Sequence, residues 1–334
     1  MSPTSTETDG QGRASAIWTL GYDLEVDHTL RARIEGDTVY FTATAFEPVV
    51  GETYSGREGY TQYTAGDLPL IVSAPHGGSL RPDEIPDRTW GTLVQDRNTW
   101  DLAMRIRAAL YEHTGGYPHL ILSNLHRVKL DPNRDLNEAA QGSAPAERAW
   151  WEFHQYIEVA EDIVARDFAD GFYIDLHGHG HDNPRLELGY LLSSTDLART
   201  DEELNATVYS TQSSLRSLAL TTPLSFPELL RGVASLGGLM EQRGYPAVPS
   251  PLQPDPGGEP YFSGGYNTHR HGSVDGAPIS GVQIECHYPG VRDTEENREA
   301  FAQALAQALK GFFLSHYGRS LTPATSPMAA AAVR

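Results

Sequence analysis

Three short polar motifs, each placed where an apolar run ends, contain the residues of this chain that could do chemistry. They are APHGG at 74–78, IDLHGHGH at 174–181 and VQIECH at 282–287. In open α/β sheets, functional side chains collect just outside the carboxyl ends of strands. Imidazole and carboxylate groups at three such ends could converge on one metal ion, which is how a hydrolytic zinc site is built.

Two histidines and one carboxylate are the candidate metal ligands. His76 and His177 each stand beside glycines, which let backbone and ligand approach closely. A hydrolytic zinc needs three protein ligands and one open position, so we expect a carboxylate as the third ligand. We favour Asp96, at the start of an expected helix, although acidic residues also stabilise helix starts with no metal present. The other carboxylates that could fill this place are Glu84 as the main alternative, Asp87 and Asp101.

The second motif places several polar groups on one strand face. Residues two apart on an extended strand point to the same side, so Asp175, His177 and His179 can share a face. A ligating histidine usually donates its other ring N–H to a carboxylate or carbonyl, and Asp175 could accept it or orient a neighbouring base. We expect His179 and His181 to line the pocket; the alternative is a surface turn rich in His and Gly.

Glu285 ends the apolar strand of the third motif and suits the role of a general base. It would take a proton from the attacking water and pass it to the leaving amine. A carboxylate is basic enough for this task because a metal has already lowered the pKa of the water. The alternative is an edge carboxylate paired with an arginine.

A dense polar cluster follows in the segment 126–135, HRVKLDPNRD. Most such clusters are solvated salt-bridge loops. The neighbouring motifs instead favour a clamp for a substrate carboxylate or an oxyanion, because the arginine fork matches carboxylates bidentately. Arg134 is preferred to Arg127 for the oxyanion, and Asn133 is expected to assist.

Strands and helices must bring these motifs together, and the apolar periodicity predicts where they run. Strands are expected at 68–74, 119–123, 171–175, 186–193 and 281–286. Helices are expected at 96–112, 145–170 and 294–317. Strands alternating with long helices predict an α/β fold with a central sheet flanked by helices.

The remaining segments are expected to be peripheral to that sheet. Short strands at 23–26, 30–34 and 38–45 predict an N-terminal β-hairpin or meander. The segment 51–66 looks like a loop. The segment 244–272, rich in Pro, Gly, Tyr and His, predicts a long functional loop that forms a wall or lid over the site.

Composition limits the classes of partner. The net charge of −19 argues against nucleic acid and anionic membranes, which require basic patches. The start of the chain does not look like a signal peptide, and no apolar run approaches the roughly 20 residues of a membrane span, so we expect a cytoplasmic protein. The single cysteine, Cys286, is expected in the core. We expect a disordered tail at 1–15, one α/β metallohydrolase domain at 16–318 and a flexible tail at 319–334.

The ordered set of motifs resembles the N-formylglutamate amidohydrolase (N-formylglutamate deformylase) family. The resemblance rests on PHGG at 75–78, DRNTWDLA at 96–103, R…DPNR at 127–134, DLH at 175–177, GGY…G at 264–272 and QIE at 283–285. It implies a zinc-dependent hydrolase with a mixed sheet similar to the zinc carboxypeptidases and aspartoacylases. It further implies that His76, Asp96 and His177 bind zinc, that Glu285 is the base, and that Arg134 with Asn133 holds a carboxylate or the oxyanion.

The chain departs from this pattern in several places. Ser79 occupies the position where the carboxypeptidases have a glutamate ligand, and the clamp has Asp131-Pro132-Asn133-Arg134 where family members often read Asp-Leu-Asn-Arg. The loop after Gly264-Gly265 contains His269, Arg270 and His271, in an order that does not match the deformylases residue for residue. These departures imply a divergent member whose substrate need not be N-formylglutamate. The further candidate substrate-binding residues are His179, Tyr266, His269 and Arg270.

The predicted function is a zinc-dependent amidohydrolase that acts on C–N bonds other than peptide bonds, in a small N-formyl or N-acyl amino acid or another small amide. A metallopeptidase or cell-wall amidase acting on a longer substrate is the first alternative. A metal- or ligand-binding protein without turnover is the second. A serine or cysteine hydrolase is disfavoured, since the chain has no Gly-Xaa-Ser-Xaa-Gly elbow.

Overall fold

The computed structural model describes residues 26–34 and 36–324, together with the isolated positions 7, 8, 10, 12, 14, 16 and 18. The chain divides into two compact units, residues 1–49 and residues 50–334. Each unit is described by itself.

The first unit contains a β-hairpin. Strand β1 (Asp27–Ile34) pairs antiparallel with β2 (Asp37–Thr44), and Thr44 Oγ1 donates a hydrogen bond of 2.7 Å to Asp27 Oδ1 across the open end. Gly36 has a φ of +99° at the turn, where glycine is favoured. The predicted N-terminal hairpin is therefore confirmed. Of the additional strand expected at 23–26, residues 23–25 lie outside the described residues.

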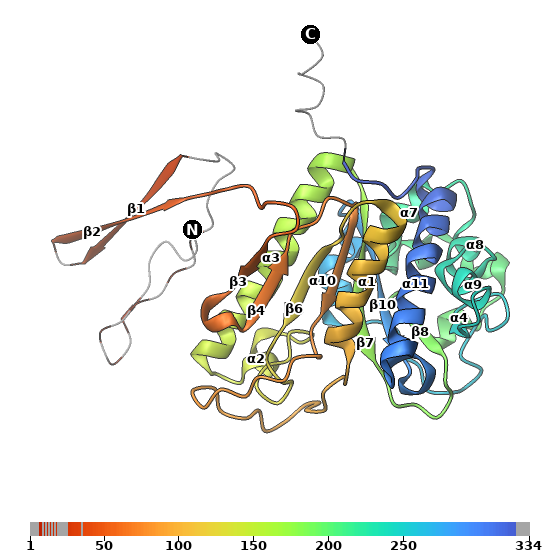
Figure 1. The fold of residues 1–334 in the computed structure, drawn as a ribbon, viewed down its shortest axis with the longest axis horizontal. Coiled ribbons are helices and arrows are strands. Elements are labelled where there is room, and N and C mark those ends of the chain that lie inside the picture. Colours follow the sequence, from red (N-terminus) through yellow and green to blue (C-terminus); the bar gives the residue numbers. More distant parts are fainter. Residues whose placement is uncertain are drawn as a thin grey trace, which may run out of the picture. The chain divides into compact units, whose positions relative to one another are not determined.

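The second unit is built on a mixed eight-stranded sheet (Figure 1). Its strand order is β3-β4-β6-β5-β7-β10-β8-β9. The four strands β6, β5, β7 and β10 run parallel in the centre. The pairs β3–β4, β4–β6 and β10–β8 are antiparallel, and β9 is parallel to β8. The bounds are β3 (Thr53–Ser55), β4 (Thr61–Thr64), β5 (Leu70–Ala74), β6 (His119–Ser123), β7 (Gly171–Gly178), β8 (Leu186–Gly189), β9 (Ala247–Val248) and β10 (Ile279–Cys286). The predicted mixed sheet flanked by helices is confirmed.

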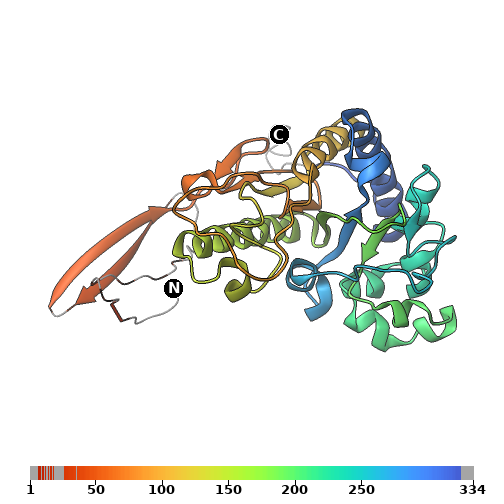
Figure 2. The same ribbon diagram turned by 90° about the horizontal axis from the view of Figure 1, so that it is seen from below.

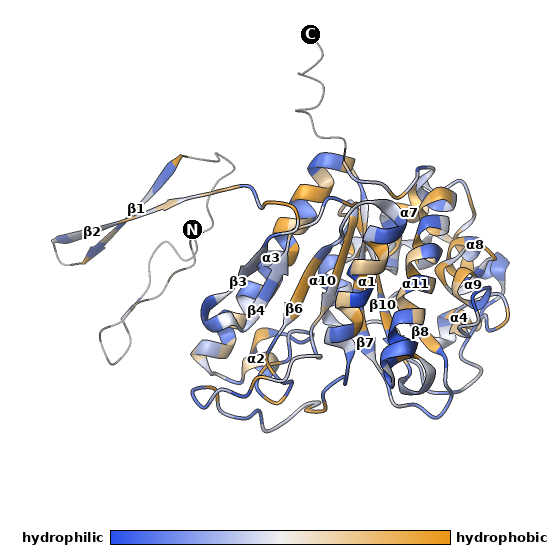
Figure 3. Cartoon of the chain, in the orientation of Figure 1, coloured by the Kyte–Doolittle hydropathy of each residue, from blue (hydrophilic) through white to orange (hydrophobic). Residues whose placement is uncertain are grey.

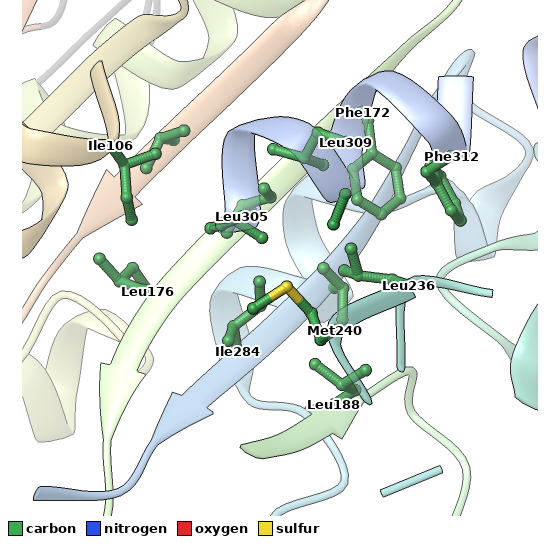
Figure 4. Packing of buried hydrophobic residues seen from close by; sticks show 14 of the residues in the cluster. Ile106, Phe172, Leu176, Leu188, Leu236, Met240, Ile284, Leu305, Leu309 and Phe312 are labelled. Atoms are coloured by element: carbon green, nitrogen blue, oxygen red, sulfur yellow. The ribbon is translucent and has the colours of Figure 1, made fainter. Parts of the chain in front are cut away.

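Long helices cover both faces of this sheet (Figure 2). The helices are α1 (Thr99–Thr114), α3 (Ala144–Phe168) and α11 (Glu295–Phe312). Alternation along β5 sets the two faces, because Leu70 and Val72 pack in one buried cluster with α1 and α11, while Ile71 packs in another with α3. Figure 4 shows the first cluster, in which Leu305 of α11 lies between Ile106 and Leu309. The central strands are buried on both faces, and the middle of β6, residues 120–122, is hydrophobic (Figure 3).

The structure corrects two expectations about local elements. The segment 51–66 contains β3, a 3₁₀ turn at η1 (Arg57–Gly59) and β4, because Thr61 and Tyr63 are buried when β4 pairs with β6. The segment 244–272 contains β9 and the helix α10 (Tyr266–His271) as well as loop. A group of short helices between β8 and β9 was not predicted. They are α4 (Ser194–Leu197), α5 (Asp201–Leu204), α6 (Thr207–Gln212), α7 (Arg216–Thr221), α8 (Phe226–Arg231) and α9 (Leu236–Glu241).

The remaining elements are short. They are α2 (Leu136–Ala140), η2 (Ser273–Asp275), η3 (Tyr288–Arg292) and η4 (Phe313–Tyr317). Across the described residues, no helix combines the length and the apolarity that a bilayer crossing requires.

Candidate metal centre

The strand order brings the three motifs to one edge of the sheet. Strands β5, β7 and β10 are adjacent and parallel, so their carboxyl ends lie together. His76 follows β5 by two residues, His177 is near the end of β7, and Glu285 is near the end of β10. His177 and Glu285 are register partners across the β7–β10 pair.

Three buried side chains form a group that could hold a metal ion. Nδ1 of His76 and Nδ1 of His177 each lie 3.2 Å from Oδ2 of Asp96. The ligand atoms of the three residues lie within 4.8 Å of one another. Two imidazole nitrogens and one carboxylate oxygen are ligands that suit zinc.

The other carboxylates considered for the third ligand position lie in separate interactions. Glu84 is exposed and accepts a hydrogen bond from the hydroxyl of Tyr60. Asp87 pairs with Lys129 at 2.9 Å, and Asp101 pairs with Arg105 at 2.8 Å. The structure therefore brings Asp96, and not Glu84, to the two histidines.

Each histidine of the group forms a hydrogen bond to a buried carboxylate through its second ring nitrogen. Nε2 of His76 donates to Asp131 at 2.6 Å, and Nε2 of His177 donates to Asp175 at 2.6 Å. With Nε2 as the donor, Nδ1 of each ring would have its lone pair toward Asp96 when a metal ion keeps the ring neutral. Carboxylate–histidine pairs of this kind fix the ring and its tautomer in metal sites, so the donor chemistry fits a divalent cation.

The electrostatics of the group favour positive charge. Burial by itself would raise the pKa of Asp96, but His76 and His177 outweigh burial and hold this pKa below its usual range. Burial would lower the pKa of His177, yet Asp175 and Asp96 raise it well above its ordinary value. These carboxylates thus stabilise a cation at this position, and a divalent metal ion would supply that charge.

Close backbone packing positions Asp96 against His76. The Asp96 N–H donates to the His76 carbonyl at 3.1 Å, and the Gly178 N–H donates to Asp96 Oδ2 at 3.2 Å. The loop after His76 packs on the first turn of α1, where a Cβ on Gly77 would stand 2.4 Å from the Trp100 nitrogen. Only glycine fits there, which explains the Pro-His-Gly sequence.

Arg127 neutralises two of the carboxylates. Its Nε donates to Asp131 at 2.9 Å, and one of its terminal nitrogens lies 3.5 Å from Asp96 Oδ1. Asp131 is wholly buried, and Arg88 Nη1 lies 3.8 Å from the same oxygen, Oδ2, that Arg127 contacts. Burial would raise the pKa of Asp131, but His76 and Arg127 keep it below the usual range.

Glu285 has the environment of a base that titrates near neutrality. Burial raises its pKa to about 8, Asp96 and Glu187 add to this rise, and His177 and Arg127 partly offset it. The Gln283 amide donates to Glu285 Oε1 at 2.9 Å. A carboxylate with such a pKa can both accept and return a proton at physiological pH.

Asn133 and α10 complete the outer layer of the group. Asn133 Nδ2 lies 3.3 Å from His177 Nε2, and the Asn267 N–H donates to Asn133 Oδ1 at 2.8 Å. Asp175 accepts from the Asn267 amide at 3.2 Å and from the Ser73 hydroxyl at 2.7 Å. Sequence reasoning missed Ser73 and Asn267, although Ser73 is the single polar residue inside the apolar β5.

Most of the expected substrate-binding residues contact groups other than His76, Asp96 and His177. Arg134 pairs with Glu138 of α2 at 3.1 Å, and Arg270 pairs with Glu158 of α3 at 2.7 Å. His179 Nε2 contacts the Arg185 carbonyl at 2.8 Å. Tyr266 lies near the ring of Trp150, with a centroid distance of 6.1 Å, and His269 is exposed on α10. Among the predicted clamp residues, Asn133 and Arg127 contact the metal group directly.

No protein-family model matches the chain, and no curated protein sequence matches it. Among solved structures, N-formylglutamate amidohydrolase from Ralstonia eutropha JMP134 is 15% identical over 76% of this chain and 97% of that chain, with a TM-score of 0.46. The succinylglutamate desuccinylase from Chromobacterium violaceum is 10% identical over 83% of this chain and 73% of that chain, with a TM-score of 0.35. The apo N-acetylmuramyl-L-alanine amidase Ami1 from Mycobacterium abscessus is 12% identical over 73% and 98%, with a TM-score of 0.35. All three likenesses are distant.

Proposed function

We propose that this chain is a zinc-dependent amidohydrolase that cleaves the amide of a small N-formyl or N-acyl amino acid, or of another small amide. The observation that carries this proposal is the placement of Glu285 in register beside His177, at the edge of a buried His76–Asp96–His177 donor set. A metal-ligand group and a carboxylate of raised pKa on neighbouring strands are the two parts that water-dependent amide cleavage requires.

The metal ligands in this proposal are His76, Asp96 and His177. A zinc ion held there would polarise the substrate carbonyl and lower the pKa of water. Asp131 and Asp175 keep the two rings oriented, since each accepts the Nε2 proton of one histidine at 2.6 Å.

Glu285 is the proposed general base. In its ionised form it takes a proton from the attacking water, and in its protonated form it returns that proton to the leaving nitrogen. Its raised pKa suits both steps, because neither protonation state is strongly disfavoured near neutral pH. The hydrogen bond of 2.9 Å from the Gln283 amide helps to fix the position of this carboxyl group.

Arg134 and Asn133 are the proposed anion-binding residues. The Arg134 side chain is 32% exposed and its partner Glu138 is 24% exposed, so a substrate carboxylate could replace Glu138 on the guanidinium. The Asn133 amide lies beside His177 and could donate to the oxyanion. Arg127 supports this region through its pairs with Asp131 and Asp96.

The test combines metal content with turnover. We expect about one zinc or more per wild-type chain by elemental analysis and a loss of about one zinc in His177→Ala. The wild type should hydrolyse N-formyl or N-acetyl amino acids, and His177→Ala should not. His113→Ala is the matched control, because this half-buried histidine on the last turn of α1 lies outside both candidate metal groups.

Three outcomes would contradict the proposal. A folded, active wild type without metal would remove the zinc site. Bound zinc without hydrolysis of any amide would favour a binding protein. Cleavage of peptides or cell-wall fragments, with small N-acyl amino acids left intact, would favour the longer-substrate alternative.

A further inference from the structure

We propose that His179, His181 and Glu187 form a second divalent-cation site next to the first. Their candidate ligand atoms lie within 4.8 Å of one another. The first two residues continue the His-Gly-His-Gly-His run of the second motif, and Glu187 comes from β8. The proposal goes beyond the proposed hydrolysis, because that reaction requires only the first group.

The hydrogen bonds of His179 show which of its nitrogens has the lone pair that a metal ion needs. Its Nε2 lies 2.8 Å from the Arg185 carbonyl oxygen, so this nitrogen must carry the proton and donate. Nδ1 therefore has the lone pair, and a bound cation would take the place of the His181 N–H that this lone pair now accepts at 3.1 Å. A ring nitrogen that donates to a carbonyl while the other faces a cation is the usual arrangement of a ligating histidine.

Glu187 is a buried carboxylate with little compensation for its charge. Its side chain is 0% exposed, and its oxygens accept from His181 Nδ1 and from the Phe262 N–H, both at 2.8 Å. In the part of the chain that the structure describes, no arginine or lysine forms an ion pair with it. A buried charge is expensive unless it is paired or coordinates a metal.

A second carboxyl group on the neighbouring strand increases this cost whenever it is ionised. Glu187 is the register partner of Glu285 across the antiparallel β8–β10 pair, and Glu285 is in turn the partner of His177. Like charges directly opposite on neighbouring strands are destabilising. A cation held by Glu187 would relieve this repulsion, and Glu285 would then lie between a ligand of each proposed ion.

A further nitrogen and a path to solvent lie beside this group. Nδ1 of His287 is buried and has no hydrogen-bond partner within the described residues, and its ring centroid is 6.3 Å from that of His179. His181 is 23% exposed and stacks on Phe262, which is 43% exposed. Imidazole and carboxylate donors select a borderline cation such as Zn²⁺ or Co²⁺.

The test is a Co²⁺ titration of the full chain after removal of metal with a chelator, followed by the absorbance of the bound ion. We expect an endpoint at about two equivalents for the wild type and about one for His181→Ala and for His177→Ala. His113 is half buried like His181, and the endpoint of His113→Ala should remain at about two equivalents of Co²⁺.

A second variant is needed because the loss of one histidine could leave enough ligands to bind the second ion. Glu187→Gln removes the charge but keeps the size, and we expect the weaker equivalent to lose at least about tenfold in affinity. A wild-type endpoint at one equivalent that His181→Ala and Glu187→Gln leave unchanged would overturn the second site. It would leave the proposed function standing, because His177→Ala would then still remove the single ion.

Discussion

Glu285 and His177 are register partners on the parallel strands β10 and β7. Because both side chains belong to buried strands, their separation is set by the ladder and does not depend on a mobile loop. The candidate base is therefore held beside a candidate metal ligand by the most rigid part of the fold.

Replacing this base should separate turnover from metal binding. We expect Glu285→Gln to lower kcat on an N-acyl amino acid by about 100- to 10,000-fold, because an amide cannot accept the proton. Bound zinc should stay at the wild-type level, since Glu285 is not in the donor set. Full activity in this variant would reject the assignment, and Glu112→Gln, which alters an exposed glutamate of α1, serves as the control.

The carboxylate behind His76 should control metal affinity. Asp131→Asn can no longer accept the short hydrogen bond from Nε2 as an anion, so we expect zinc to bind about 10- to 100-fold more weakly. Competition with a chromogenic chelator measures this change. Asp87→Asn, which alters an exposed carboxylate paired with Lys129, should bind zinc as the wild type does. Equal affinity in the two variants would show that Asp131 does not support the ligand.

Gly77 should be intolerant of a side chain. A Cβ there would stand 2.4 Å from the Trp100 backbone nitrogen, so Gly77→Ala must displace the loop that carries His76. We expect a loss of about 1–3 kcal/mol in the free energy of unfolding, together with weaker zinc binding. Gly180→Ala has open space around its Cβ and should change the stability by less than about 0.5 kcal/mol. Urea unfolding of both variants would test the difference, and similar stabilities would contradict it.

His119 should make the fold sensitive to acid. It is buried in β6, accepts from the Tyr63 hydroxyl at 2.9 Å, and has its pKa lowered by burial from 6.5 to about 3. In the unfolded chain His119 is therefore protonated below about pH 6.5, whereas in the folded chain it is protonated only below about pH 3. The contribution of neutral His119 to the free energy of unfolding is fully present above pH 6.5. It falls by up to about 1.4 kcal/mol per pH unit as the pH drops toward 3.

A comparison of variants isolates this contribution from other titrating groups. Urea unfolding between pH 7.5 and 4.5 should show a shallower loss of stability in His119→Gln than in the wild type, because glutamine does not titrate. His113→Gln, at a half-buried position, should retain the wild-type slope. Parallel profiles for the wild type and His119→Gln would contradict the prediction.

Local patterns in the sequence were sufficient to predict the central strands and the long helices. Apolar runs that end in polar motifs placed His76, His177 and Glu285 at strand ends, and the 3.6-residue periodicity located α1, α3 and α11. Strand alternation also placed Asp175 on the same face as His177, and the two side chains are in contact. These features depend on residues close together in the chain, which is why they were predictable.

Tertiary packing decided which distant residues meet. Asp131 lies 55 positions from His76, and Asn267 lies 134 from Asn133, so no local pattern could pair them. The sequence left several carboxylates as possible third ligands. The packing of the loop after β5 on α1 brings Asp96 to the two histidines. The opposition of Glu187 and Glu285 follows from the antiparallel register of β8 against β10, which segments far apart in sequence set when they pack. The sequence by itself determined the kinds of donor and the strands that carry them, whereas the order and register of those strands decided which donors converge, because register depends on contacts across the sheet.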